Sequence, residues 1–340
     1  MRSKVFFING GAGRVITSIP ALEKYAETHD DFVIVAEGGM NFFKGHPVLD
    51  KFAYDHWHKN LFEDKIKDRD CITPEPYRRW HYYNQKCNIA QAYDMEINGL
   101  DEPRDLPTPK IKLSKTEAIN ALNLVEQIKA KTKKDKVIVV QPFGRGAEVQ
   151  GEYIIDQSSR SFHQRDIVEV INNLRKDYGV IIMSEFQFVV DPPDSNMIPC
   201  AWPQADIRVW AGIIECADHF LGCDSVGQHI AKSVGTTVTT VIGATFPVNI
   251  SYPEDRNFDI IDIGKGKRVF QPLRLTAEDY QDMMNDECMK MKKEDVQSVI
   301  TSCRKRLGKS KDYSGNLKLE EEQQPEKCCD NAPQLRGFGK

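Results

Sequence analysis

The 340-residue sequence lacks the patterns that identify several common classes of protein. Its nine cysteines form no C-x-x-C pair, so we expect reduced thiols in a cytoplasmic protein rather than a zinc ribbon or a redox motif. It has no run of about 18 apolar residues, and the apolar run at the N-terminus is too short for the hydrophobic region of a signal peptide. A net charge of −4 with a pI near 6.1 excludes a strongly basic nucleic-acid-binding protein, although a local basic patch stays open.

Two common phosphate-binding motifs are also missing. A glycine cluster, Gly10-Gly11-Ala12-Gly13, follows an apolar run, but it has neither the G-x-G-x-x-G spacing nor the Gly-Lys-Ser/Thr ending of a P-loop. NAD binding and ATP hydrolysis therefore have little support. Two interpretations stay open: a tight strand-to-helix turn that needs glycine, or a wall of backbone N–H groups that faces an anion or sugar hydroxyls.

The sequence does contain two stretches in which apolar strands alternate with helices. In the first, strands are predicted at 4–8 and 32–36 around a helix at 18–28. The second has strands at 137–140, 180–183, 219–222 and 238–242, with helices at 165–176, 207–216 and 227–234. This pattern predicts an α/β protein with two doubly wound, Rossmann-like domains that face each other across a cleft.

The composition of the chain indicates where these domains end. Three prolines in 101–110 mark a linker, so we expect an N-terminal domain at 1–110 and a C-terminal domain at 111–275. Two helices are predicted within 276–307. The polar, charged stretch 308–340 is expected to be a disordered tail.

The segment around Asp224 carries the strongest functional signal. A strand ends at Gly222, Ser225 can cap the next helix, and Gly227 and His229 lie in its first turn. A helix dipole, free amides and an imidazole together suit a diphosphate. The simpler alternative is that Asp224 or Ser225 only caps the helix.

Five segments of the chain resemble the glycosyltransferase family 9 proteins, the ADP-heptose:lipopolysaccharide heptosyltransferases and their relatives. Residues 222–229 resemble the family's G-x-D-T/S-G-x-x-H signature, with the glycine one place later, and 243–245 resemble its Gly-x-Thr loop. Residues 141–144 resemble the family's strand end at the start of this domain, and residues 159–162 resemble the family's segment that carries a basic residue. Residues 10–20 resemble the family's G-x-x-G-D-x-x-x-x-x-P opening.

The resemblance implies a GT-B architecture and inverting sugar transfer without a metal or other cofactor. The donor would be a nucleotide-diphosphate sugar, an ADP-sugar by family default, bound to the C-terminal domain. The implied donor-binding residues are Gly144, Arg160, Asp224, Ser225, Gly227, His229 and Thr245. The acceptor would lie on the N-terminal domain near Gly11 and Gly13, and the final helix would pack back onto that domain.

One position departs from the family pattern. Where the family has an aspartate that acts as general base, this chain has Arg14, which stays protonated at neutral pH. We expect another carboxylate to act as base, with Glu37, Asp94 and Glu96 as candidates. Two alternatives stay open: Arg14 holds an anionic acceptor or the donor phosphate while His81 or Asp94 is the base, or the protein binds a sugar nucleotide without transferring it.

The acceptor is not identified by the sequence. Arg78, Arg79 and Trp80 lie in the aromatic and basic segment 74–86, which suits an anionic glycan or lipid-linked acceptor, or a nucleic acid, with peripheral membrane contact open. The alternative is an amphipathic segment with packed aromatic rings. A sugar-nucleotide epimerase, a DNA or RNA glycosyltransferase and a non-catalytic sugar-nucleotide-binding protein remain alternative functions. No metal site is expected.

Overall fold

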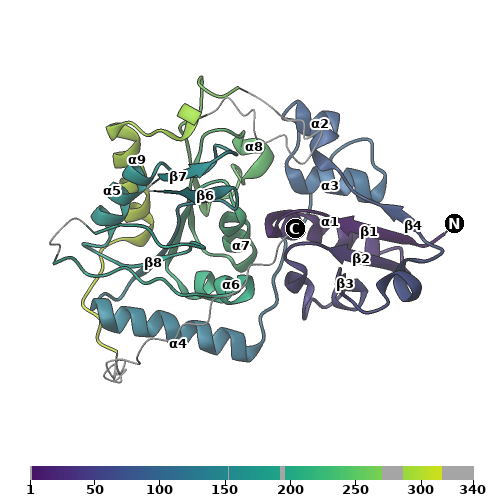
Figure 1. Ribbon diagram of the computed structural model, residues 1–340, viewed down its shortest axis with the longest axis horizontal. Helices are drawn as coiled ribbons and strands as arrows, with labels where there is room; N and C mark the ends of the chain where they lie inside the picture. Colours follow the sequence, from purple (N-terminus) through teal and green to yellow (C-terminus); the bar gives the residue numbers. More distant parts are fainter. Residues whose placement is uncertain (1, 152, 192–195, 270–285, 316–340) are drawn as a thin grey trace.

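The computed structural model describes residues 2–151, 153–191, 196–269 and 286–315. Two parallel β-sheets form two α/β domains that lie side by side (Figure 1). The N-terminal sheet has the strand order β3-β2-β1-β4, and the C-terminal sheet has the order β11-β10-β9-β5-β8. All paired strands within these two sheets run parallel, so the predicted doubly wound α/β architecture is confirmed.

The N-terminal domain forms around two short apolar strands and one long helix. Its main elements are β1 (Lys4–Ile8), α1 (Ala12–Ala26), β2 (Phe32–Ala36), β3 (Ala53–Asp55), β4 (Asp70–Ile72), α2 (Trp80–Tyr83) and α3 (Ile89–Asn98). Short turns lie at η1 (Met40–Phe43), η2 (Asp50–Phe52), η3 (Phe62–Ile66) and η4 (Pro76–Arg78). Helix α1 begins at Ala12 rather than at the predicted residue 18, because the chain turns directly from Gly10 into the helix.

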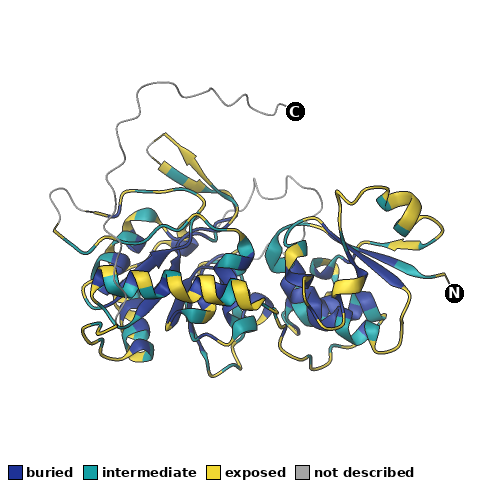
Figure 2. Cartoon of the chain, turned by 90° about the horizontal axis from the view of Figure 1, so that it is seen from below, coloured by how far each residue is buried: buried dark blue, intermediate teal, exposed yellow. Residues whose placement is uncertain are grey.

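The C-terminal domain begins with α4 (Lys115–Thr132), which starts at a capping box between Ser114 and Glu117. Its strands are β5 (Val137–Gln141), β6 (Ala147–Gln150), β7 (Tyr153–Asp156), β8 (Gly179–Ile182), β9 (His219–Gly222), β10 (Val238–Ile242) and β11 (Phe258–Asp262). Its other helices are α5 (Gln164–Leu174), α6 (Ile207–Cys216), α7 (Val226–Val234), α8 (Pro247–Ile250), η5 (Asp286–Met289) and α9 (Lys293–Leu307). Strands β6 and β7 form an antiparallel hairpin that we did not predict, and Figure 2 shows it standing out from the domain.

The C-terminal residues differ from our expectation in two ways. Helix α9 packs on α5 and on the C-terminal sheet, where Val299 and Ile300 are buried, and not on the N-terminal domain. The predicted disorder from residue 308 is wrong for 308–315. The backbone of Asp312 forms an antiparallel β-bridge with Lys134, and the Tyr313 hydroxyl donates to Glu126 at 2.6 Å. The predicted positions 276–285 and 316–340 lie outside the described residues.

Specific contacts hold the two domains together. The Asn249 side chain at α8 donates to the carbonyls of Tyr82 and Cys87 at 2.8 and 3.0 Å. On the other side, Arg208 of α6 donates to the carbonyl of Asn41 in η1 at 2.8 Å. None of the helices in the described part of the chain is long and apolar enough to cross a membrane.

Candidate functional site

The first turns of α1 and α7 meet where the two domains join. A Cβ placed on Gly13 of α1 would lie 3.3 Å from Cδ2 of His229 and 3.8 Å from Cα of Val226, both in the first turn of α7. A side chain here would make a tighter contact than most, and the imidazole would have to shift by a few tenths of an ångström. The glycine cluster and the Asp224–His229 segment, singled out separately in the sequence, therefore lie together at one place, which we call the domain junction.

The backbone of the glycine cluster is shaped by its neighbours at the end of β2. Gly10 has a φ of 93°, and its N–H donates to Oε2 of Glu37 at 2.7 Å. A Cβ on Gly38 would lie only 2.6 Å from the carbonyl oxygen of Gly10, so these two loops touch through their backbones. Glu37, a predicted catalytic candidate, thus lies at the domain junction, with one oxygen engaged by this turn.

Arg14 is fixed in place by three neighbours. Its Nε donates to the Tyr93 hydroxyl at 2.9 Å, its Nη2 pairs with Oε1 of Glu75 at 3.1 Å, and its guanidinium lies 5.0 Å from the Tyr77 ring centre. Burial alone would lower the pKa of Arg14, but these neighbours, Tyr93 first, raise the pKa above its ordinary value. Arg14 therefore stays a cation and cannot accept a proton from an acceptor.

The other predicted base candidates are engaged elsewhere. Asp94 is buried, and both of its oxygens accept from Arg104, at 2.6 and 2.9 Å, which fastens the linker to α3. Glu96 pairs with Arg79 at 3.3 Å, and burial raises the pKa of Glu96. Neither carboxylate has a described contact with α1's glycine turn or with α7.

On the C-terminal side, Asp224 organises two loops. Its Oδ2 accepts from the Thr245 hydroxyl at 2.8 Å, and its Oδ1 accepts from Nε2 of Gln228 at 3.3 Å. Asp224 is buried, so these bonds fix the loop after β10 against the start of α7. The structure thus brings together Asp224 and Thr245, as the predicted donor-binding set requires.

The start of α7 is capped by a residue that the sequence did not reveal. Ser225 occupies the cap position, but its side chain makes no cap bond. Instead Oε1 of Gln141 accepts from the Gly227 N–H at 2.9 Å, and Nε2 of Gln141 donates to the Ser225 hydroxyl at 3.1 Å. The expectation that Ser225 caps this helix and leaves all first-turn amides free is therefore wrong.

His229 is a neutral side chain within this cluster. Its Nδ1 shares a hydrogen bond of 2.9 Å with the Tyr252 hydroxyl. Burial first, and then the positive charge of Arg160, lower the pKa of His229 to about 4. At neutral pH the imidazole contributes hydrogen bonding and shape rather than charge, and positive charge must come from the arginines.

A half-buried carboxylate, Asp156, holds the loop that carries Arg160. Asp156 accepts hydrogen bonds from the hydroxyls of Ser158 and Ser161, each at 2.5 Å, and the Ser161 hydroxyl accepts from the Gly144 N–H at 2.9 Å. Burial alone would raise the pKa of Asp156, but these hydrogen bonds and the charge of Arg160 lower it. Asp156 thus connects the loop of Gly144 to the loop of Arg160, and the sequence did not reveal this role.

A second cation from the C-terminal domain reaches the N-terminal glycine turn. A Cβ on Gly11 would lie 3.8 Å from Nη1 of Arg145, which is exposed. The glycines that flank Arg145 in the sequence were the available signal. Arg145 joins Arg160 as a positive group on the C-terminal side of the domain junction.

The predicted acceptor residues do not form one cluster. Arg79 binds Glu96 and the Leu100 carbonyl within its own domain, whereas the Trp80 ring is 63% exposed and Arg78 is exposed. In the described residues no group of three or more His, Cys, Asp and Glu side chains could hold a metal ion. Metal independence stays a prediction.

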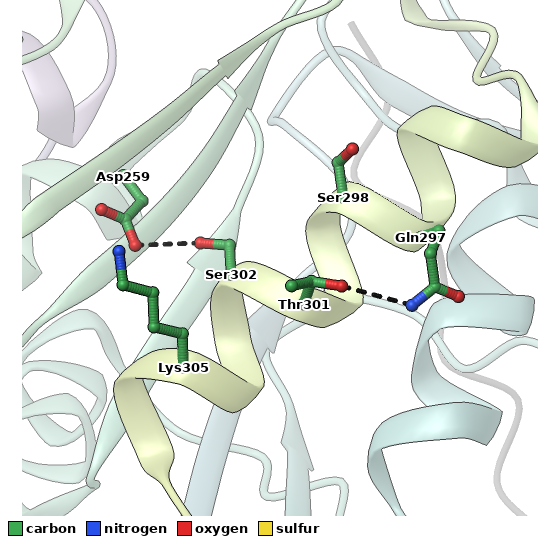
Figure 3. A pocket seen from close by; sticks show the side chains of 6 residues that line it. All are labelled: Asp259, Gln297, Ser298, Thr301, Ser302 and Lys305. Carbon is green, nitrogen blue, oxygen red and sulfur yellow. Dashed lines mark hydrogen bonds between the residues drawn. The ribbon is translucent and has the colours of Figure 1, made fainter.

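An open surface pocket of about 390 Å³ lies away from the domain junction, beside α9 (Figure 3). Ser302, in its wall, donates to Asp259 at 3.0 Å and shares a hydrogen bond of 2.8 Å with Thr239, which contacts the buried His219. These bonds dock α9 on the sheet. The packing of α9 therefore accounts for the polar residues that line the pocket.

The comparisons with known proteins identify the fold. No protein-family model and no curated protein matches the sequence. A glycosyl transferase family 9 structure from Veillonella parvula matches with a TM-score of 0.57 at 12% identity, over 90% of this chain and 97% of that one. The iron-containing dodecameric glycosyltransferase TibC from enterotoxigenic E. coli matches with a TM-score of 0.52 at 13% identity, over 89% and 78%. TibC in complex with ADP-D-beta-D-heptose gives 0.51 at 12% identity, over 90% and 76%.

This chain has the fold of those glycosyltransferases. The predicted resemblance to family 9 and the GT-B arrangement are therefore confirmed at the level of the fold. At 12–13% identity the likeness does not extend to the substrate.

Proposed function

We propose that this protein is an inverting, metal-independent glycosyltransferase that moves a sugar from a nucleotide-diphosphate sugar to an acceptor hydroxyl. The observation that carries the proposal is the meeting of α1 and α7 at the domain junction. The C-terminal side of the junction carries the cations Arg145 and Arg160, and the N-terminal side carries the carboxylate Glu37 and the Arg14–Glu75 pair. Sugar transfer needs a cation near the leaving diphosphate, where negative charge develops, and a carboxylate near the acceptor, which must lose a proton.

The donor diphosphate would lie on the C-terminal domain, near the first turn of α7. Arg160 and Arg145 would stabilise the charge that develops on the diphosphate, as a metal ion does in other transferases. Asp224 and Gln141 would hold the Thr245 loop and the helix start in the binding geometry. ADP is the first nucleotide to test, because the matched TibC structure is a complex with ADP-D-beta-D-heptose.

The acceptor would lie on the N-terminal side, beside Gly11 and Gly13. We keep three predictions from the sequence. The acceptor is a glycan or a lipid-linked molecule, the protein is located in the cytoplasm, and it can contact a membrane peripherally. The comparisons give no support to a nucleic-acid acceptor, which we do not carry further. Because TibC is iron-containing, metal independence needs its own test: activity should survive EDTA.

Isothermal titration calorimetry with ADP, UDP, GDP, CDP and dTDP tests the donor half. We expect one nucleotide to bind, and Asp224→Asn to weaken that binding at least tenfold, because the amide no longer accepts from both Thr245 and Gln228 as the carboxylate does. Asp177→Asn is the matched control, since Asp177 pairs with Arg304 beside α9. Equal affinity in wild type and Asp224→Asn would contradict the donor site.

A non-catalytic sugar-nucleotide-binding protein is the second candidate, and Arg14 favours it because arginine replaces the expected base. A sugar-nucleotide epimerase is the third. Release of ADP from ADP-heptose distinguishes the transferase, since neither alternative predicts it. Binding without release would support the non-catalytic protein, and isomerised donor in the absence of acceptor would support the epimerase.

A further inference from the structure

We infer that Glu75 is the general base of the proposed transfer and that Arg14 positions it; this inference rests on the proposed function. Glu75 follows β4, which runs parallel to its neighbour β1. The segment with Glu75 and the glycine turn after β1 therefore leave the sheet at the same end. Oε1 of Glu75 is held by Nη2 of Arg14 at 3.1 Å. Glu75 lies in the aromatic and basic segment 74–86 that suits an acceptor, but the sequence pattern did not mark it as a base.

Arg14 connects Glu75 to the helix that meets the donor domain. Arg14 lies one residue after Gly13, and Gly13 is the point where α1 touches His229 of α7. Glu75 therefore pairs with the residue that follows the contact between α1 and α7. A general base must come within hydrogen-bond reach of the acceptor hydroxyl, and an acceptor beside Gly11 and Gly13 would lie at the same helix start as this pair.

The guanidinium of Arg14 is itself held rigidly. Tyr93, which is fully buried, binds Nε, and the Tyr77 ring covers one face. Because the arginine cannot swing freely, the carboxylate it holds has a defined direction. Oε2 of Glu75 has no hydrogen-bond partner among the described residues, so it is available for a substrate hydroxyl.

Its partner and its exposure together separate Glu75 from the other candidate bases. Its side chain is 31% exposed, whereas Asp94 is fully buried and paired with Arg104. Glu37 is more exposed, and its Oε2 accepts from the backbone N–H of Gly10. Glu96 is exposed to a similar extent, 28%, but it pairs with Arg79 and not with a residue of α1. Among these four carboxylates, Glu75 is the one that pairs with the helix that meets α7.

The chemical step is balanced without any further reactant. The acceptor oxygen forms a bond to the anomeric carbon of the donor sugar while its proton passes to Oε2 of Glu75. The bond between the anomeric carbon and the diphosphate oxygen breaks, and its electron pair leaves with the nucleoside diphosphate. With water as acceptor, the same step releases ADP and the free sugar from ADP-heptose.

ADP release from ADP-heptose and ADP affinity, measured on the full chain, test the inference. Glu75→Gln keeps an oxygen for Arg14 but removes the base. We expect at least a 100-fold loss of ADP release with ADP affinity within threefold of wild type. In Glu75→Ala, added formate should restore part of the lost rate, which a merely structural role would not allow. Glu102→Gln, at an exposed carboxylate that pairs with His81, should match wild type.

The outcomes separate the two levels of the argument. Glu75→Gln with the wild-type rate, or a comparable loss seen only in Glu37→Gln, would overturn the assignment of Glu75 and leave the transferase standing. A Glu75→Ala protein that binds ADP but gains nothing from formate would also count against it. Wild-type protein that binds none of ADP, UDP, GDP, CDP and dTDP, and releases none of them from its sugar conjugates, would overturn the proposed function and this inference together.

Discussion

Arg208 connects four segments of the chain, and its removal should destabilise the association of the two domains. The side chain is only 6% exposed. Its Nε and Nη2 donate to the two oxygens of Glu117 at 2.5 and 2.7 Å, while Nη1 and Nη2 donate to the carbonyls of Asn41 and Lys112, each at 2.8 Å. Arg208→Met retains the apolar stem and removes all of these donors.

The expected loss is about 3 kcal/mol. Breaking a buried charge pair by removing one partner costs roughly 3–5 kcal/mol, because the other charge is left without compensation. Glu117 is 22% exposed, so water can replace part of the lost interaction and the lower end of that range applies. The carbonyls of Asn41 and Lys112 lose a donor as well, which keeps the expected loss above that of a surface pair.

Urea unfolding followed by tryptophan fluorescence measures this loss, with Trp210 buried two residues away on α6. The double variant Arg208→Met/Glu117→Gln should lose at least about 1 kcal/mol less than the sum of the single variants, because the two residues share one interaction. Additive losses in the double variant, or a loss below about 1 kcal/mol in Arg208→Met, would refute the proposed contribution of the Arg208–Glu117 pair to stability.

The same pair predicts a pH dependence. Hydrogen bonds from Arg208 are the largest cause that lowers the pKa of Glu117, from an ordinary value of 4.5 to about 2. Because the folded pKa is depressed, the contribution is present above pH 4.5 and is lost as the pH falls towards 2. The stability difference between wild type and Arg208→Met should therefore narrow through this window, and a constant difference would contradict the linkage.

Three further predictions concern the domain junction. Because the pKa of buried His229 falls from 6.5 to about 4, wild type should lose roughly 3 kcal/mol between pH 6.5 and 4, and urea unfolding should show a smaller loss in His229→Asn. Gly10→Ala should lower the melting temperature more than Gly235→Ala does. Both glycines have a positive φ, but only at Gly10 would the new Cβ have a neighbour within 3 Å. Asp156→Asn should weaken nucleotide binding in calorimetry by releasing the loop of Arg160, and unchanged binding would refute that role.

The sequence predicted the sheets because their strands are short, apolar and buried on both faces. β5 (Val137–Gln141) is buried at every position, as parallel strands between helices are. The hairpin β6–β7 escaped prediction for the opposite reason: its residues are mostly exposed, and nothing in their spacing distinguishes them from a loop. The pattern of α9 predicted a helix, but an amphipathic pattern does not say which domain receives the apolar face.

The candidate site was predicted where its residues are close in sequence and missed where they are not. Asp224 and His229 lie on one turn, so a local pattern reveals them. Gln141 and Gly227 are 86 residues apart, and Arg14 and Glu75 are 61 apart. Such hydrogen bonds depend on how strands are ordered in the sheet, which periodicity and spacing do not determine.

The Arg14–Glu75 pair changes what the missing aspartate means. An isolated arginine at the start of α1 would place a second positive charge beside the amides of a helix N-terminus, which favours anions and not cations. Glu75 supplies the compensating anion from the neighbouring strand end, at 3.1 Å. The N-terminal side of the domain junction thus has a carboxylate paired with position 14, where the resemblance implies an aspartate. If Glu75 is the base, as we propose, the arginine at position 14 favours the non-catalytic protein less than it would alone.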